Sequence, residues 1–405
     1  MHILFLTDNF PPEVNAPATR TFEHCQEWIK KGHQVTVITC APNFPHGKVY
    51  AGYKNKFYQS ETVNKIRVIR VWSYMSSNNG FSKRVLDYFS FACMSFFVGI
   101  FQKHDVIVAT SPQFFTTWSG WALSKIRRKP WIFELRDLWP ESIKTVGAMK
   151  QGRVIDLLEK IELGLYKSCN KVVAVTDAFK NNLITRGIRK DKIEVITNGS
   201  NMELFYPREA DLDLLGSLGL NDKFVVGYIG THGMAHGLDF IVKSIRKVSD
   251  PSIHFLFIGD GATKQGIVKL AKELNLINIT FLDPIDKEQV PKYLSIVDVS
   301  LAPLIKSDTF KTVIPSKIFE SSAMQKPTLL GVEGQAQEIL EKYGAGVCFE
   351  PENEKDFLEK LNVLKEVSVY EKCQAGCEVL AKEYDRKVLA NKMLNVIKTV
   401  EGGSR

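Results

Sequence analysis

Residues 224–233 read Phe-Val-Val-Gly-Tyr-Ile-Gly-Thr-His-Gly, a short apolar run that leads directly into a glycine-rich turn. A second stretch repeats this pattern, because the run His254–Ile258 leads into Gly259-Asp260-Gly261. Continuous apolar runs of this length are typical of strands buried on both faces of a parallel sheet. The helical periodicity between such runs predicts βαβ units.

Similar runs, rich in Val and Ile, recur along the chain with longer amphipathic stretches between them. In the first half they are His2–Thr7, Gln34–Thr39, Arg67–Trp72, Val106–Thr110, Trp131–Leu135, Lys171–Val175 and Glu194–Thr197. In the second half they are Phe224–Ile229, His254–Ile258, Ile279–Leu282, Val297–Ala302, Pro327–Leu330 and Gly346–Phe349. The series breaks around residues 200–222, which indicates a domain boundary there.

The chain has 405 residues, more than one hydrophobic core usually supports, so two domains are expected. The predicted fold class is α/β, with two Rossmann-like doubly wound domains that face a central cleft. We expect the first domain to cover residues 1–205 and the second to cover residues 206–385. A last helix over residues 386–401 is expected to pack back on the first domain.

The formal charge of +8 is concentrated in the first half of the chain. Residues 1–200 contain 28 Lys and Arg against 16 Asp and Glu, whereas residues 201–405 contain 25 against 29. A basic first half suits an acidic partner, such as a phosphate-bearing substrate, an anionic membrane surface or a nucleic acid. A solvated basic face is the alternative. No nucleic-acid-binding motif accompanies the charge, so we expect no nucleic-acid partner.

The seven cysteines are scattered and form no CxxC pair. The chain opens with a strand-like run and not with a sequence typical of a signal peptide. We therefore expect free thiols and a cytoplasmic protein.

One segment, Val85–Phe101, is apolar almost all round, with Asp87 as its only charge and basic residues at both flanks. It falls short of the roughly 20 residues that span a bilayer. It could lie in the membrane interface with its basic flanks on anionic headgroups. A helix buried between the sheet and its neighbours is the alternative. The lipid-facing candidates are Phe89, Phe91, Phe96, Phe97 and Phe101.

The glycine turns are candidates for a nucleotide site. Glycine lets the backbone approach a ligand closely, and helix N-termini attract phosphate. In open α/β sheets the ligand lies beyond the carboxyl ends of the strands, where these turns are expected. The alternative is that glycine serves only the geometry of tight turns. The candidate residues are Gly230, Thr231, His232, Gly233, Gly259, Asp260 and Gly261.

Residues 315–328 read Pro-Ser-Lys-Ile-Phe-Glu-Ser-Ser-Ala-Met-Gln-Lys-Pro-Thr and predict a helix with Pro315 in its first turn. Lys317 and Glu320 are three residues apart and share a face of that helix. With Ser316 they form a second set of nucleotide candidates, in which the ammonium meets a phosphate and the carboxylate accepts ribose hydroxyls. An ion pair between Lys317 and Glu320 is the alternative.

Asp137 follows the run Trp131–Leu135 and is the candidate catalytic residue, placed to orient or deprotonate an acceptor hydroxyl. Arg136 beside it is expected near a phosphate. Capping of the helix that follows is the alternative for Asp137. Asn15 and Arg20, beyond the first run, are candidates to face the acceptor or the leaving diphosphate. For these two, a loop-stabilising hydrogen bond or salt bridge is the alternative.

We expect no catalytic metal. Asp211-Leu212-Asp213 is formally a DxD motif, but it lies in the interdomain connection, where a helix start or a solvated loop is expected. His232 and His236 have ligand spacing but lack a nearby Cys or carboxylate. Leaving-group charge must then be neutralised by Lys317, other cations and helix dipoles.

Residues 315–328 resemble the signature of the family 4 glycosyltransferases, which have the GT-B fold. The second Glu of that family's E-x7-E motif holds the donor ribose, and Glu320 matches it, whereas the first Glu falls at Thr312. The Arg and Lys that the family usually carries after the first strand of its second domain fall at Thr231 and His236. The resemblance implies that Lys317 and the Gly230–Gly233 backbone replace this phosphate clamp.

The resemblance covers nearly the whole chain. Residues 134–142, Glu-Leu-Arg-Asp-Leu-Trp-Pro-Glu-Ser, resemble a subgroup found in bacterial O-antigen and capsule clusters, as do residues 43–48. Within it, the chain is similar to transferases that use UDP-N-acetyl-L-fucosamine to extend undecaprenyl-diphosphate-N-acetylglucosamine. Other matching segments are His2–Phe10 with Pro11-Pro12, Arg20, residues 31–37, Ser111-Pro112, and Asn198-Gly199 with Phe205 and Pro207.

The resemblance implies a metal-independent transferase with a UDP-sugar donor and an undecaprenyl-diphosphate-linked acceptor. The first domain would bind the acceptor and the second the donor, with the protein held peripherally on the inner face of the cytoplasmic membrane. The family generally retains the anomeric configuration. A nucleotide-sugar epimerase of the same fold and a non-catalytic membrane-associated scaffold are the alternatives.

Overall fold

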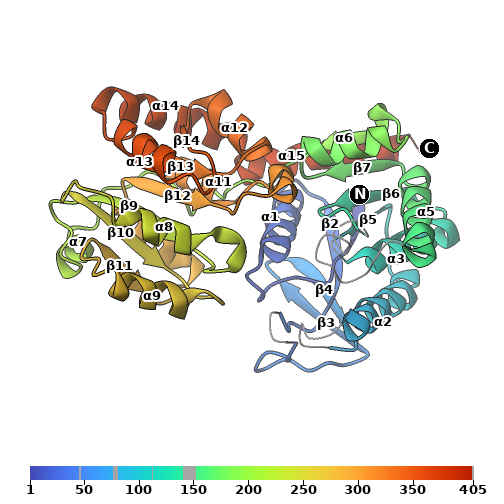
Figure 1. Cartoon of the computed structure of the whole chain (residues 1–405). Coiled ribbons are helices and arrows are strands. Elements are labelled where there is room, and N and C mark those ends of the chain that lie inside the picture. Colours follow the sequence, from blue (N-terminus) through green and yellow to red (C-terminus); the bar gives the residue numbers. More distant parts are fainter. Residues whose placement is uncertain (45–46, 76–80, 112, 140–151, 404–405) are drawn as a thin grey trace. The chain divides into compact units, whose positions relative to one another are not determined.

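The computed structural model describes residues 1–44, 47–75, 81–111, 113–139 and 152–403 (Figure 1). The chain divides into two compact units. The first is Met1–Thr197 together with Arg386–Arg405, and the second is Asn198–Asp385. The first unit therefore ends at Thr197, before the boundary at residue 205 that the sequence suggested.

In the first unit, the described residues form a sheet of eight strands in the order β3-β4-β2-β1-β5-β6-β7-β8. All neighbouring pairs are parallel except β3 with β4. The chain leaves β1 toward β2 on one side and reaches β5 on the other, so the strand order reverses between β1 and β5. The strands are β1 (His2–Leu6), β2 (Gln34–Cys40), β3 (Tyr58–Val63), β4 (Ile66–Val71), β5 (Val106–Thr110), β6 (Trp131–Leu135), β7 (Lys171–Ala174) and β8 (Ile193–Val195).

Helices cover both faces of this sheet. One apolar cluster joins the sheet to α2, α3, α5 and α6, and a second joins its other face to α1 and α15. The helices are α1 (Ala16–Lys30), α2 (Phe81–Ile100), α3 (Phe114–Arg127), α5 (Arg153–Ser168), α6 (Asp177–Thr185), η1 (Lys190–Lys192) and α15 (Arg386–Gly402). The predicted return of the last helix is confirmed, since the Trp28 indole of α1 donates to the Ala390 carbonyl at 2.9 Å.

The second unit has a six-stranded, fully parallel sheet of order β11-β10-β9-β12-β13-β14, which reverses between β9 and β12. Its strands are β9 (Phe224–Ile229), β10 (Ile253–Ile258), β11 (Ile279–Leu282), β12 (Val299–Pro303), β13 (Thr328–Gly331) and β14 (Gly346–Cys348). Its helices are α7 (Leu212–Ser217), η2 (Met234–His236), α8 (Leu238–Ile245), α9 (Lys264–Glu273), η3 (Lys287–Gln289), α10 (Val290–Ser295), η4 (Asp308–Thr312), α11 (Lys317–Ala323), α12 (Gln335–Tyr343), α13 (Glu354–Val363) and α14 (Val367–Glu383).

The two predicted Rossmann-like domains are confirmed, and each predicted apolar run coincides with a strand. The sequence did not reveal β3, because this antiparallel edge strand alternates exposed and half-buried residues and has no apolar run. Pro315 precedes α11 and does not lie in its first turn, since the helix begins at Lys317.

The apolar segment around residue 90 forms α2, and its phenylalanines have different environments. Phe89 and Phe97 are exposed, as expected of lipid-facing candidates. Phe91 is fully buried, and Phe96 is half-buried against the core, so these two expectations are corrected. In the described part of the chain, no helix is both long and apolar enough to cross a bilayer.

Candidate functional site

The two glycine turns of the second unit pack directly on each other at the carboxyl ends of β9 and β10. A Cβ at Gly259 would lie 1.9 Å from the Gly230 carbonyl oxygen, and one at Gly261 would lie 2.5 Å from the His232 carbonyl oxygen. The His232 amide donates to the Asp260 carbonyl at 2.8 Å. Packing of one turn against the other therefore accounts for Gly259 and Gly261. The polar candidates Thr231 and Asp260 remain exposed.

Lys317 reaches from the start of α11 to the end of β9, at the point where the strand order reverses. A Cβ at Gly230 would lie 2.9 Å from Cε and 3.2 Å from the ammonium of Lys317, and the φ of 147° at Gly230 favours glycine. The ammonium lies 3.5 Å from the centroid of the Tyr228 ring, in cation–π geometry. Burial lowers the pKa of Lys317 to about 7, and Glu320 opposes the shift. Ser316 is the exposed N-cap residue of α11.

Glu320 lies one turn beyond Lys317 but does not pair with it. Its carboxylate is 3.2 Å from the ammonium of Lys287, which also lies over the Phe205 ring at 5.9 Å. The alternative of an ion pair within the helix is therefore wrong. No sequence pattern pointed to Lys287, because its place beside α11 depends on the loop that follows β11.

His232 is fully buried between the rings of Tyr228 and Phe257. Within the described residues neither ring nitrogen has a hydrogen-bond partner. Burial, followed by the charges of Lys264 and Lys317, lowers the pKa of His232 to about 4. The ring is therefore neutral at pH 7, and its contribution to the site is shape and not charge. Gly233 is the N-cap of η2, and its carbonyl oxygen lies 3.3 Å from Nδ1 of the His236 ring.

In the first unit, Asp8 and Gln113 meet where the strand order reverses. Asp8 follows β1, Gln113 follows β5 as the N-cap of α3, and the Gln113 amide donates to the Asp8 carboxyl. The second carboxyl oxygen of Asp8 is buried and has no partner among the described residues. Burial, followed by the carboxylates of Asp87 and Glu13, raises the pKa of Asp8 to about 8. Asp8 is thus largely uncharged at pH 7.

No sequence motif singled out Asp8 or Gln113. The signal that points to them is a polar residue just after each of the two strands that flank the reversal. Their contact joins residues 105 positions apart and needs the sheet order to be known.

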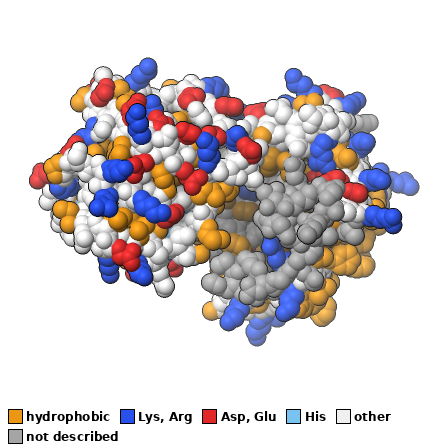
Figure 2. Space-filling view, in the orientation of Figure 1, with side chains coloured by type: hydrophobic (Ala, Val, Ile, Leu, Met, Phe, Trp, Pro, Cys, Tyr) orange, Lys and Arg blue, Asp and Glu red, His pale blue; other side chains and the backbone are white. Residues whose placement is uncertain are grey.

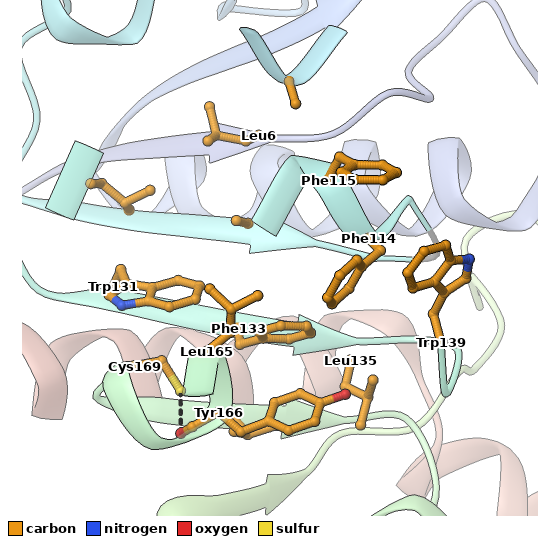
Figure 3. Packing of buried hydrophobic residues seen from close by; sticks show 14 of the residues in the cluster. Leu6, Phe114, Phe115, Trp131, Phe133, Leu135, Trp139, Leu165, Tyr166 and Cys169 are labelled. Carbon is orange, nitrogen blue, oxygen red and sulfur yellow. Dashed lines mark hydrogen bonds between the residues drawn. The ribbon is translucent and has the colours of Figure 1, made fainter. Parts of the chain in front are cut away.

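Arg136 and Asp137 lie just after β6, the strand next to β5. The Arg136 amide donates to the Ser111 hydroxyl at 2.9 Å, and one guanidinium nitrogen is buried without a partner among the described residues. Burial lowers the pKa of Arg136 to about 9, opposed by Glu134. Trp139 anchors this segment, because its ring stacks on Phe114 at 4.5 Å (Figure 3). Asp137 is half-buried, and the helix that it was alternatively expected to cap falls outside the described residues.

Arg20 and Asn15 both make the structural contacts that were the alternatives to a ligand-facing role. The Arg20 side chain is 1% exposed, and its guanidinium bonds to Glu134 at 3.0 Å and to the carbonyls of Ile196 and Thr197. Asn15 is the N-cap of α1 and accepts from the Ala18 amide at 2.9 Å. Arg20 ties α1 to the end of the first unit, and Asn15 fixes the start of that helix.

Asp211 caps α7 by accepting from the Leu214 amide at 2.8 Å, so the predicted helix start is confirmed. The residues that the structure describes contain no group of three or more His, Cys, Asp or Glu arranged to hold a metal ion. All seven cysteines are free. The expectation of metal-independent chemistry stays a prediction.

Two family models match the chain, one for each unit. "Glycosyltransferase Family 4" matches residues 18–204, and "Glycosyl transferases group 1" matches residues 215–375. The colanic acid biosynthesis glycosyl transferase WcaI of Escherichia coli K12 is 26% identical over 87% of this chain and 89% of its own length.

Solved structures show the same fold. Sucrose-phosphate synthase from Thermosynechococcus elongatus has a TM-score of 0.76 at 16% identity, with 100% of both chains covered. Anabaena HepE, solved in complex with UDP, has a TM-score of 0.73 at 17% identity over 98% of this chain and 100% of that chain. The two matched models cover most of the sequence between them, and the chain belongs to the GT-B glycosyltransferases of group 1 and family 4.

Proposed function

We propose that the protein transfers a sugar from a UDP-sugar to a sugar on a membrane lipid diphosphate, in O-antigen or capsule synthesis. N-acetyl-L-fucosamine is the proposed sugar, carried over from the subgroup resemblance. The observation that carries the donor half is the half-buried Lys317, whose ammonium lies beside Gly230 at the strand reversal of the second unit. HepE, which shares the fold, was solved with UDP.

The donor diphosphate would lie over the Gly230–Gly233 turn, with Lys317 as its cation. An approaching phosphate stabilises the charged ammonium, so binding would raise the lowered pKa of Lys317. The ribose hydroxyls would donate hydrogen bonds to the Glu320 carboxylate, which forms an ion pair with Lys287 in the structure. Releasing Lys287 toward the diphosphate would supply a second cation without any metal. A chelator should then leave turnover unchanged.

The acceptor would bind at the carboxyl ends of β1, β5 and β6. Its hydroxyl oxygen forms a bond to C1 of the donor sugar while the bond from C1 to the diphosphate oxygen breaks and UDP departs. Asp137 would receive the hydroxyl proton, and Arg136 would contact a phosphate. Asp8 suits a positioning task, because a largely uncharged carboxyl can hydrogen-bond a sugar hydroxyl in either direction.

Turnover with a panel of UDP-sugars and a short-chain prenyl-diphosphate-N-acetylglucosamine tests this proposal. We expect a disaccharide product by mass spectrometry and release of UDP, and NMR of the product gives its stereochemistry. An altered donor sugar in the absence of acceptor would establish the epimerase instead. Absence of both turnover and UDP binding would establish the scaffold.

A further inference from the structure

The outer faces of α2 and α3 expose large apolar side chains (Figure 2). Their exposed fractions reach 58% for Phe97 and 84% for Phe101, far above those of core residues. The exposed residues on and just after α2 are three, eight and four residues apart, which places them on one side of that helix. They are Leu86, Phe89, Phe97 and Phe101 from α2 and the turn that follows it, and Trp121 and Ile126 from α3.

The two helices form a single surface. They lie against the same face of the sheet. Residues later in α2 contact residues later in α3, so the two helices run in the same direction. The contacts are the Phe89 ring on the Phe115 ring, the Ser119 hydroxyl on the Ala92 carbonyl at 2.6 Å, and Gly99 beside Leu123. A Cβ at Gly99 would lie 2.6 Å from the Leu123 side chain, so the two helices approach each other closely at this point. Their outer faces therefore continue into each other.

Exposed cations flank this apolar surface at both ends. In the described part of the chain, none of these cations forms an ion pair with a carboxylate. They are Lys83 and Arg84 at the start of α2, Lys103 just after it, and Lys125, Arg127 and Arg128 at the end of α3. Apolar side chains between basic ends are the combination that binds an anionic lipid surface.

We propose that the surface formed by α2 and α3 docks the protein on an anionic lipid bilayer, with Phe97, Phe101, Trp121 and Ile126 in the interface. The proposal rests on the proposed function, because a lipid-linked acceptor is presented at such a surface. It adds α3, which no sequence feature had indicated, and it removes Phe91 from the lipid contact. Trp121 suits the headgroup level, where tryptophan is enriched.

Sedimentation with vesicles of phosphatidylglycerol and phosphatidylcholine, compared with phosphatidylcholine alone, tests the proposal. We expect binding to the anionic vesicles that weakens as salt is added. Phe97→Ser with Phe101→Ser should reduce this binding by about tenfold or more. Arg127→Glu with Arg128→Glu should remove the preference for anionic lipid. Matched controls in the second unit are Ile277→Ser, an exposed apolar residue, and Lys272→Glu, an exposed cation.

Failure of this proposal can be separated from failure of the proposed function. The surface variants should keep wild-type turnover on a water-soluble short-chain acceptor. If the wild-type protein glycosylates that acceptor but does not bind anionic vesicles, the docking surface is refuted and the transferase stands. If it binds vesicles without any turnover, the opposite holds. The proposal would also be overturned if the protein does not bind vesicles but forms a concentration-dependent dimer that Phe97→Ser disrupts. The surface would then be an interface between two copies of the chain.

Discussion

The reversal points of the two sheets have the same topology and opposite chemistry. In each unit, the order of the strands reverses between two neighbouring strands. A residue just after the first of them contacts a residue at the start of an α-helix that follows the second. In the first unit the pair is Asp8 with Gln113, and in the second it is Gly230 with Lys317. Burial moves the pKa of Asp8 up to about 8 and that of Lys317 down to about 7. One fold feature thus gives an acidic group for a hydroxyl and a basic group for a phosphate.

The proposed mechanism places the catalytic residue in the first unit, so the largest expected effect belongs there. Asp137→Asn should lower turnover by roughly 10²- to 10⁴-fold, because it removes the proton acceptor. UDP affinity, measured by calorimetry, should stay at the wild-type value, since the donor site lies in the other unit. Turnover near that of wild type would make Asp137 a helix cap.

The second unit should respond in the opposite way. Lys317→Met removes the cation at the strand reversal and should weaken UDP binding by about 10- to 100-fold. Lys269→Met, at an exposed position on α9, is the matched control and should bind UDP normally. The donor assignment is wrong if both variants bind UDP equally well.

Glu320→Gln should weaken UDP binding by about tenfold, because a neutral amide accepts the ribose hydroxyls less strongly. The same variant should bind inorganic pyrophosphate as the wild type does, since pyrophosphate has no ribose. An equal loss for both ligands would show that Glu320 acts on the phosphates through Lys287 and not on the ribose.

The charge of Lys317 predicts how UDP-sugar affinity depends on pH. Below the lowered pKa of about 7, Lys317 is already a charged ammonium in the ligand-free protein. Above this pH it is a neutral amine, which must gain a proton when the diphosphate binds. Affinity should therefore fall by up to about tenfold per pH unit as pH rises above 7. In Lys317→Met this dependence should vanish, and a slope that persists there belongs to another group.

The smallest effect concerns stability. The folded-state pKa of Asp8, about 8, lies above its ordinary value of 3.8, so the folded protein binds the proton more tightly than the unfolded chain. This group lowers stability progressively as pH rises from 3.8 to about 8, and Asp8→Asn should remove that loss. We expect Asp8→Asn to be more stable than the wild type at neutral pH in denaturant unfolding, with a gain that shrinks as pH falls toward 3.8, together with reduced turnover. A stability difference that does not change with pH would contradict the shifted pKa.

The parts of this account that sequence could predict are those set by local pattern. Buried parallel strands are continuous apolar runs, so their positions followed from the sequence, whereas the polar edge strand β3 did not. Asn15 could have been read as a cap, since proline follows it at the start of α1.

Long-range contacts decided the remaining residues. Arg20 is occupied by Glu134 and by carbonyls more than 170 positions away, which its place beyond the first apolar run did not reveal. Phe96 and Phe97 are neighbours in sequence, and the packing of α2 against the rest of the first unit determines which of them reaches solvent. The pairing of Lys287 with Glu320 likewise depends on how the loop after β11 folds.

A structure of the protein crystallised with UDP tests the central claim most directly. We expect the diphosphate to lie over the Gly230–Gly233 turn within hydrogen-bonding distance of the Lys317 ammonium, with the ribose on Glu320 and Lys287 released from it. UDP bound elsewhere, or bound while Lys317 stays on the Tyr228 ring and Lys287 stays on Glu320, would contradict it.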